Sequence, residues 1–509
     1  MSAEHSARLH ELFDWRLATD ADRPFLHTVD GIVTLGGLGA LVATIEAELR
    51  SESVSPGDRV MAIAENCVQH IALILACSRV GAWSCGVNAR MSPGEIAGFV
   101  EKADPTLIYF TTCVSDAASG HAQTLNATPS ALDGLHRTAR RDMAVAETGP
   151  LRDEVAAVIF TSGTTGASKG VLVSHAGLVH FGRISAESRH LGPDDLSYAY
   201  LPMTHIFGLG TVLAASLYAG AGLVMRARFD PADVFSALAH GGVTNLQGPP
   251  AMFARLLSWL DEQRITSPAC PALRYLYTGA APLDMTLKQA VEGRLGKPLH
   301  HGYGLSEYAG ALCLVRMGEQ RQDTGAGYLV EGGELQITDS QGKPVPDGER
   351  GEIWMRGVGL MPGYFRDAEA TSNVMKPGGW YASGDIGYIG ADGALFVVGR
   401  TKEMIIRSGF NVYPGEIEAV LMRFEGIRSA AVVGRREPDG NEQILAFVEA
   451  DSSEKPIDMN ALNRHLHEHL AAYKRPSLVT QVVSMPMTLS GKVLKRTLLE
   501  TYAHLLDAD

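Results

Sequence analysis

The first hundred residues alternate between two hydrophobic patterns. Apolar side chains recur at helical spacing over 38–49 and again over 67–80, which predicts two helices. Short continuous apolar runs lie within 56–65 and over 106–110, and such runs predict buried strands. Strands that alternate with helices are typical of βαβ units around a mainly parallel sheet. The pattern therefore favours an α/β fold.

The same alternation of strands and helices continues through the long segment 155–398. Before it, residues 115–150 are rich in Ala, Ser, Thr and Asp and have weak periodicity, which predicts that most of this segment is a surface excursion. The segment 198–225 is strongly apolar, but Pro202 and several glycines interrupt it. A membrane helix needs about 20 mostly apolar residues in a row, so a buried helix behind a polar loop fits this segment better.

The pattern changes near Gly399, where elements become shorter and mixed. Strands are expected at 428–437 and 442–450, and a helix at 459–476. We therefore predict two domains, a large multi-sheet N-terminal domain and a small α+β C-terminal domain. Their expected bounds are 1–399 and 400–509. Domains that meet at a short joint commonly form a ligand cleft between them.

Composition limits the function classes that remain. With 46% hydrophobic and 20% charged residues, the 509-residue chain is globular. Its net charge of −13 argues against a protein that coats nucleic acid or an anionic membrane, because both need a basic face. The six cysteines form no CxxC pair, and the N-terminus lacks the apolar run of a signal peptide. We therefore expect a cytoplasmic protein with reduced thiols and no integral membrane segment.

The strongest chemical signal is a loop of six hydroxyl or glycine residues, 161–166, which follows an apolar run and precedes Lys169. Its exposed backbone N–H groups can surround phosphate oxygens, and the lysine adds a charge. A Walker A loop is excluded, because Ser168 precedes the lysine and Gly170 follows it. The alternative interpretation is a plain hairpin turn, so the loop favours phosphate binding without proving it.

Four further motifs carry polar groups beside glycines. They are HGYGLSE at 301–307, WYASGD at 380–385, the basic segment 399–418 and SGK at 490–492. The first can present a ring to a nucleotide base and a carboxylate to Mg²⁺, and the second can offer a carboxylate to ribose hydroxyls. Each motif alone is also compatible with an ordinary turn or a solvated basic surface.

Taken together, the order and spacing of these motifs resemble the adenylate-forming superfamily of acyl-CoA synthetases, luciferases and nonribosomal-peptide adenylation domains. The resemblance covers essentially the whole chain. It implies that a carboxylate attacks the α-phosphate of ATP to give acyl-AMP and pyrophosphate, and that coenzyme A then displaces AMP. It also implies Mg²⁺ as cofactor and a small C-terminal domain that swings over the site.

The resemblance further implies a role for each matching residue. The catalytic residues would be Lys492, Glu307, which would hold Mg²⁺, and Thr161. The nucleotide would contact Thr161, Ser162, Gly163, Thr164, Thr165, Gly166, Lys169, Gly279, Ala280, Ala281, Tyr303, Gly304, Ser306, Asp385, Arg400 and Lys492. The acyl group would contact His205, Phe207, Gly208, Ala280 and Gly304. Coenzyme A would contact Ser408, Gly409 and Phe410, and Lys402 would be the hinge.

The acid is constrained mainly by what the pocket lacks. The stretch 201–208 has no carboxylate to hold an amino group, so a free amino acid is unfavoured. Gly208, Gly210 and Ala280 are expected to leave room for a ring or a medium chain. Arg255 is interpreted as a helix-surface residue rather than a partner for a second carboxylate. We therefore expect an apolar aromatic or medium-chain monocarboxylate.

Two alternatives stay open at this point. One is an acyl-AMP ligase that loads a carrier-protein thiol, although no carrier domain is visible. The other is a nucleotide-binding regulator without catalysis. The presence of Glu307 and Lys492 argues against this alternative. The expected partners are the small carboxylic acid and coenzyme A rather than nucleic acid, and a homodimer is left open.

Overall fold

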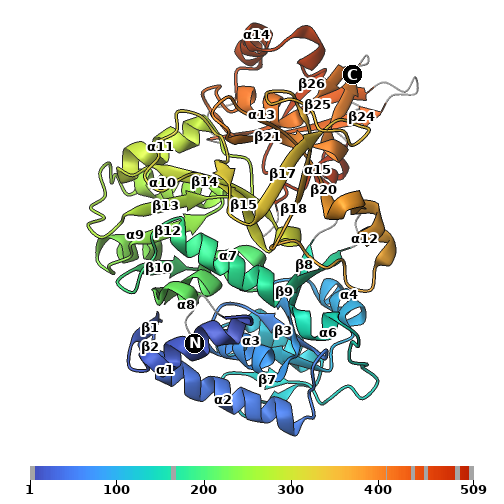
Figure 1. The fold of residues 1–509 in the computed structure, drawn as a ribbon. Coiled ribbons are helices and arrows are strands. Elements are labelled where there is room, and N and C mark those ends of the chain that lie inside the picture. The colour runs from blue at the N-terminus through green and yellow to red at the C-terminus, as the bar shows by residue number, and fades with distance from the viewer. Residues whose placement is uncertain are drawn as a thin grey trace.

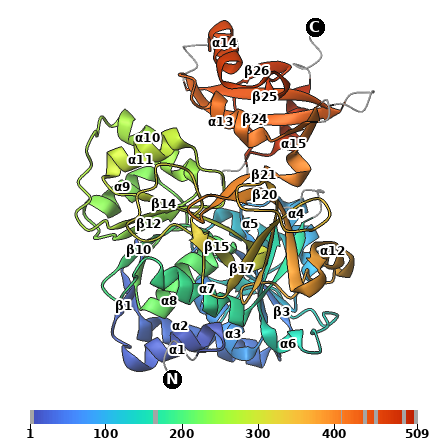
Figure 2. The same ribbon diagram turned by 45° about the horizontal axis from the view of Figure 1, so that its top comes forward.

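The computed structural model describes residues 6–161, 168–407, 410–436, 442–451, 457–487 and 493–503. It is a mixed α/β structure with a large N-terminal domain and a smaller C-terminal domain, as the sequence predicts. In Figures 1 and 2 the C-terminal elements lie at one end of the molecule, and the first helix, α1 (Leu9–Thr19), lies at the other.

The first large sheet contains the strands expected near the N-terminus. Its central strands are parallel and continuously buried, because helices cover them. The expected helices are present as α2 (Leu35–Ser51) and α3 (Val68–Val80). Among the described residues, seven strands join in the order β6 (Thr128–Pro129), β7 (His136–Arg137), β5 (Leu107–Phe110), β3 (Arg59–Ala64), β4 (Trp83–Asn88), β8 (Val155–Thr161) and β9 (Lys169–Ser174).

The second large sheet carries the strands that lead to most of the predicted site residues. Its described strands follow the order β16 (Tyr328–Leu329), β15 (Gly310–Leu314), β14 (Leu299–Leu305), β13 (Tyr275–Thr278), β12 (Asn245–Gly248), β10 (Leu196–Ala199), β11 (Gly222–Met225), β1 (Pro24–His27) and β2 (Ile32–Thr34). Helices α9 (Pro231–Ala239), α10 (Pro250–Glu262) and α11 (Met285–Leu295) group together on one side of it (Figure 1).

Between the two large sheets lie α7 (His175–Glu187), the π-helix η2 (Phe207–Ala214) and α8 (Ala215–Ala219) (Figure 1). The last two come from the apolar segment 198–225, and both are buried almost throughout. Their hydrophobicity therefore reflects burial on all sides. Within the described parts of the chain, no helix is both long and apolar enough to span a membrane.

One expectation about the N-terminal domain is wrong, and another holds only in part. The strand–helix alternation does not continue to 398, because an antiparallel sheet follows β16. Neighbouring strands in this sheet are antiparallel, and loops that contain Gly and Asp, at 339–350 and 390–394, join two of the pairs, as in hairpins. In order along the sheet these strands are β17 (Gly333–Thr338), β18 (Gly351–Gly357), β20 (Trp380–Ile389) and β19 (Met375–Lys376), with β21 (Leu395–Arg400) also paired to β20.

The expectation that holds in part is that most of residues 115–150 form a surface excursion. They contain a helix, α5 (Asp116–Thr124), whose His121 is buried and hydrogen-bonded to the Ala89 carbonyl. They also contain β6 and β7, and β7 extends the first sheet by pairing with β5. The small polar residues there cap and pair elements, so weak periodicity concealed a real extension of the sheet.

The C-terminal elements have hydrophobic clusters of their own, built around Ile417, Ile444 and Leu462 and around Phe447 and Leu498. The strands expected from the sequence are present, and the expected helix is present but ends at His469 rather than at residue 476. They are β24 (Ile427–Arg436), β25 (Glu442–Ala450) and α14 (Met459–His469), accompanied by β22 (Ile405–Arg407), β23 (Phe410–Val412), α13 (Pro414–Leu421), β26 (Leu478–Val482) and α15 (Lys495–Thr501).

Candidate active site

The carboxyl ends of β13 and β14 place two predicted nucleotide segments side by side. The strands are parallel, and Thr278 pairs with His301. The loop of Gly279, Ala280 and Ala281 follows β13 directly. A Cβ added at Gly279 would lie 3.4 Å from the Gly302 carbonyl oxygen, so the loop lies against β14. Ligands of parallel sheets commonly bind beyond these strand ends.

Ala280 adopts a backbone conformation that side chains disfavour. Its φ is +66°, in the left-handed region, although it has a Cβ. Such strain costs on the order of 1 kcal/mol and clusters at ligand sites. The exposed Ala280 is therefore a geometric sign of function at the end of β13.

A second group joins β14 to the antiparallel sheet through Asp385. The Tyr303 hydroxyl donates to Asp385 Oδ2 at 2.6 Å, and Arg400 Nε donates to Oδ1 at 3.0 Å. Asp385 and Arg400 are register partners on β20 and β21. Burial and the neighbouring carboxylate raise the pKa of Tyr303 well above its ordinary value, so it stays a hydroxyl donor. A buried carboxylate held in this way is suited to accept hydrogen bonds from ribose hydroxyls.

A third group connects Glu307 with the mouth of the glycine-rich loop. Tyr364 donates its hydroxyl proton to Glu307 Oε1 at 2.9 Å. The Lys169 ammonium lies 4.4 Å from the centre of the Tyr364 ring, a cation–π distance. Lys169 pairs with Thr161 across the β8–β9 hairpin. The hairpin mouth and the carboxylate are therefore neighbours, while Ser162, Gly163, Thr164, Thr165 and Gly166 lie outside the described residues.

Several groups around Glu307 shift the pKa of its carboxyl in opposite directions. Burial raises the pKa of its carboxyl, Arg400 lowers it, and Asp385 raises it. It lies in the short helix η3 (Ser306–Tyr308), whose Ser306 is buried. Within the described parts of the chain, no group of three or more His, Cys, Asp or Glu side chains could hold a metal. One carboxylate is nevertheless enough for Mg²⁺ when substrate phosphates supply the other ligands, so the donor set fits a nucleotide-bound Mg²⁺.

Phe207, a predicted acyl contact, forms an aromatic wall with Tyr277 beside the end of β13. The Phe207 ring meets the Tyr277 ring edge to face, with centroids 5.7 Å apart. Tyr277 Oη lies 3.2 Å from the position that a Cβ on Gly279 would occupy. His205 Nδ1 accepts a hydrogen bond from the Phe207 backbone N–H at 3.1 Å, and burial lowers the pKa of the imidazole. His205 is therefore neutral at pH 7 and suits an apolar pocket.

Gly208 and Gly210 do not leave room for substrate in the way that the sequence suggested, and Gly304 is packed in the same manner. A Cβ on Gly208 would lie 2.2 Å from the Pro202 carbonyl oxygen, and one on Gly210 would lie 2.9 Å from the Phe181 ring. A Cβ on Gly304 would lie 2.1 Å from the Gly310 carbonyl oxygen. Protein atoms already fill these spaces, so the three glycines allow close packing of the chain. The free space of an acyl pocket must come from elsewhere.

Three residues that the structure places in or beside these groups were not predicted from the sequence. Tyr364 donates a hydrogen bond to Glu307, which is 57 residues away in the sequence. Tyr277, whose ring packs on Phe207, lies just before the predicted nucleotide segment 279–281. The third is a buried cation. Arg255 is exposed above the Phe229 ring, as expected for a surface arginine, whereas Arg189 is 2% exposed and contacts η2. A helix-terminal arginine gives no local sign of such burial.

Of the predicted C-terminal residues, the structure describes Lys402 and part of Phe410. Lys402 is exposed in the short helix η5 (Thr401–Glu403), which follows β21. The backbone of Phe410 pairs with Arg407 in the β22–β23 hairpin. Ser408, Gly409, the Phe410 side chain and Lys492 lie outside the described residues.

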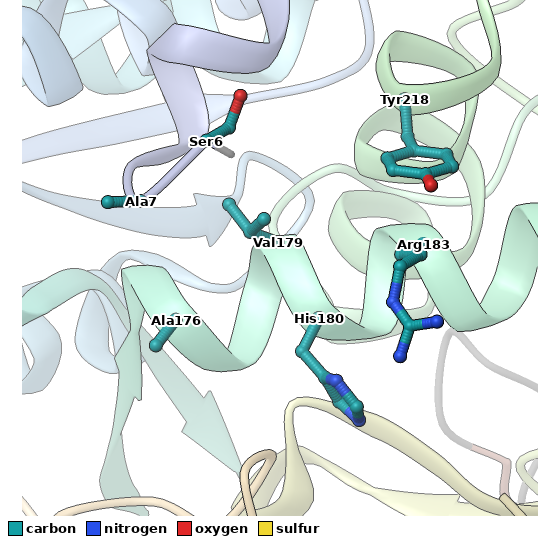
Figure 3. Close-up of a pocket in the computed structure, with 7 residues that line it drawn as sticks. All are labelled: Ser6, Ala7, Ala176, Val179, His180, Arg183 and Tyr218. Carbon is teal, nitrogen blue, oxygen red and sulfur yellow. The ribbon is translucent and has the colours of Figure 1, made fainter. Parts of the chain in front are cut away.

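A cavity of about 280 Å³ lies elsewhere, on the outer side of α7. Figure 3 shows its lining, in which Val179 points toward Ser6 while His180 points to the other side of the helix. None of the residues predicted from the sequence lines it. The candidate site is therefore the strand-end groups described above, which lie apart from this cavity.

Comparison with known proteins agrees with this geometry. The sequence model of the family described as AMP-binding enzyme matches residues 13–365, and that of the AMP-binding enzyme C-terminal domain matches residues 416–492. A 4-coumarate–CoA ligase 5 from Oryza sativa subsp. japonica is 32% identical over 96% of this chain and 94% of its own length. A feruloyl-CoA synthase from Amycolatopsis sp is 32% identical over 91% of this chain and 92% of its own.

The fold is also found in solved structures. The crystal structure of ATP-bound MatB from Rhodopseudomonas palustris superposes with a TM-score of 0.86 at 28% identity. The match covers 98% of this chain and 99% of that one. The similarity therefore includes both domains.

Proposed function

The chain belongs to the AMP-binding enzyme family and is an AMP-forming acid–CoA ligase, and we propose that its acid is an aromatic or medium-chain monocarboxylate. The observation that carries the choice of acid is the wall of Phe207 and Tyr277 with the neutral His205 beside it. Such a wall favours an apolar acyl group. The aromatic acids in the names of the two relatives agree with this choice.

The reaction joins the acid to coenzyme A in two steps. The carboxylate attacks the α-phosphate of ATP, which forms acyl-AMP and releases pyrophosphate. The thiolate of coenzyme A then attacks the acyl carbon and releases AMP. The first step brings two anions together, so the enzyme must position them and neutralise their charge.

We assign the charges of the first step to residues on both domains. The 161–166 loop and Lys169 would hold the β- and γ-phosphates, and Asp385 with Arg400 would bind the ribose. Ala280, Ala281 and Tyr303 would line the adenine. Glu307 would hold Mg²⁺, which would shield the negative charge of the phosphates. Lys492 would lie between the carboxylate and the α-phosphate.

The second step is proposed to use another orientation of the domain 400–509, with Lys402 as the hinge. Ser408, Gly409 and Phe410 would then contact the pantetheine arm of coenzyme A. The support is that Lys492 and Gly409 share one small domain yet would serve different steps. The domain boundary, a homodimer and a cytoplasmic location stay predictions.

Pyrophosphate release across a panel of carboxylic acids, with and without coenzyme A, tests the proposed function. We expect release to depend on ATP, Mg²⁺ and the acid, and thioester to appear only with coenzyme A. Formation of ADP and orthophosphate would contradict the proposal, because it would place the attack at the γ-phosphate. Adenylation that never yields a thioester with free coenzyme A would instead favour a carrier-protein acceptor.

A further inference from the structure

A buried arginine without a carboxylate partner lies behind the aromatic wall. Arg189 is 2% exposed, and burial lowers the pKa of its guanidinium to about 10. It follows the end of α7 and reaches both η2 and β12. Among the described residues, no carboxylate lies within ion-pair distance of it, although a buried charge normally requires a partner.

The guanidinium is held by neutral acceptors. Its Nε donates to the Ser185 carbonyl at 2.9 Å, and one terminal nitrogen donates to Gln247 Oε1 at 3.0 Å. The other terminal nitrogen donates to Ser185 Oγ at 3.1 Å and to the Thr211 carbonyl. A guanidinium has five N–H donors. Within the described structure, one N–H, on the nitrogen that contacts Gln247, therefore has no acceptor.

A small cavity adjoins this guanidinium. Its volume is about 10 Å³, which is room for about one water molecule. It is lined by Phe181, Ser185, Ser188, Arg189, Thr211, Tyr275, Tyr277 and Leu314. Burial raises the pKa of Tyr275 to about 12 and also raises that of Tyr277, so both rings stay neutral. The cavity therefore offers hydrogen-bond donors and one positive charge to a single small polar group.

The cavity lies one layer behind the proposed acyl contacts. Tyr277 lines it, and the hydroxyl of the same residue reaches toward Gly279 at the nucleotide edge. Phe207 packs on Tyr277, and Thr211, four residues later on η2, lines the cavity. An acid whose carboxylate lies at the nucleotide edge would extend past Phe207 and Tyr277 toward Arg189.

We propose that Arg189 recognises an oxygen atom at the far end of the acid. The preferred substrate would then be an aromatic or medium-chain acid with a single distal hydroxyl or carbonyl oxygen. This inference rests on the proposed function and adds the polar end that the pocket selects. The size of the cavity limits that end to one heavy atom beyond the chain or ring, which is too little for a second carboxylate.

Matched pairs of acids test the proposal by pyrophosphate release. Cinnamate with 4-coumarate, benzoate with 4-hydroxybenzoate, and octanoate with 8-hydroxyoctanoate differ by one distal oxygen and cover three lengths. A hydrogen bond to a charged group contributes about 1.5–3 kcal/mol, so the best acid should be oxygen-bearing and preferred about 10- to 100-fold in kcat/KM. In Arg189→Met this preference should fall to about threefold or less, since the donors are gone while the side-chain volume is similar.

Arg59→Met is the matched control. Arg59 is also fully buried, and its guanidinium donates to the carbonyls of Gly57, Ala103, Val145 and Asp104. It lies on β3 in the other large sheet, so its replacement should lower stability without changing the preference between paired acids. Arg189→Lys keeps the charge with fewer donors and should retain part of the preference, which provides a second variant if Arg189→Met does not fold.

The outcomes separate this inference from the function on which it rests. No pyrophosphate from any acid would contradict the proposed function. Release that is equal within every pair, or greater for the plain acids, would overturn the role of Arg189 and leave the function standing. An equal loss for both members of a pair in Arg189→Met, with the preference unchanged, would make Arg189 a structural residue only.

Discussion

Replacement of Asp385 by Asn tests the nucleotide site without changing the shape of the side chain. Asp385 is 7% exposed and accepts hydrogen bonds from Tyr303 and Arg400. In Asp385→Asn the carboxylate charge is lost, and one of its two oxygens becomes an amide group that can only donate. If the carboxylate binds the ribose hydroxyls, the variant loses much of that binding.

The magnitude follows from the charged hydrogen bonds that disappear. A hydrogen bond to a charged group contributes about 1.5–3 kcal/mol, and the remaining amide oxygen compensates in part. A net loss of about 2 kcal/mol corresponds to an increase of about 30-fold in the KM for ATP. The KM for the acid should change much less, because the acid does not contact Asp385.

The assay is pyrophosphate release against ATP concentration, supported by thermal unfolding with and without ATP. Asp195→Asn is the matched control. Asp195 is also buried, accepts hydrogen bonds from Arg274 at 2.6 Å and Thr244 at 2.7 Å, and lies at the opposite, amino end of β10. Both variants should lose stability, but only Asp385→Asn should weaken the binding of ATP. A similar small change in the KM for ATP in both would show that Asp385 only joins β14 to β20.

Three further predictions concern the two steps and their pH dependence. Glu307→Gln should lower adenylation about 10²-fold or more and abolish its response to Mg²⁺ titration. The pKa of Glu307 is raised in the folded protein, so its carboxyl stabilises the fold at low pH, and this stabilisation is lost as the pH rises. The ligand-free Glu307→Gln variant should therefore melt at a higher temperature than wild type at pH 8 and not at pH 4. Lys492→Ala should lower pyrophosphate release about 10²- to 10³-fold yet still convert supplied acyl-AMP and coenzyme A to thioester; normal pyrophosphate release would favour a solvated lysine. Lys402→Pro, which restricts φ at the joint, should form acyl-AMP nearly normally and thioester slowly, and equal loss of both steps would argue against a hinge there.

Elements set by local periodicity were predictable from the sequence. The apolar spacing over 38–49 and 67–80 requires only neighbouring residues to be read correctly, and both segments are helices. The antiparallel strands after β16 were missed, because burial along β17 and β20 does not alternate residue by residue, so their sequences lack the period-2 pattern of a strand. Whether a strand pairs with parallel or antiparallel neighbours is a property of the whole sheet.

The candidate site residues that lie in sequence motifs could be predicted, whereas those that only tertiary packing brings together could not. Asp385 and Arg400 lie in recognisable motifs, and the structure brings them together as register partners. Arg189 meets Gln247 across 58 residues, and an arginine at a helix end is ordinarily a surface cation that favours the helix dipole. Gly208 was also expected to leave room for substrate, but the Pro202 carbonyl already occupies the space beside it.

The proposed joint between the domains has side-chain contacts on both sides of Lys402. On the N-terminal side, Arg400 ends β21 and is held by Asp385. On the C-terminal side, Lys495 donates to Glu403 and Glu418, at 2.9 Å in each case; burial lowers the pKa of Lys495, but these two carboxylates raise it overall. A rotation about the proposed hinge that preserves both contacts would therefore take place between Arg400 and Glu403. Because the proposed ribose ligand is also the N-terminal anchor, nucleotide binding and domain orientation share one carboxylate and are expected to influence each other.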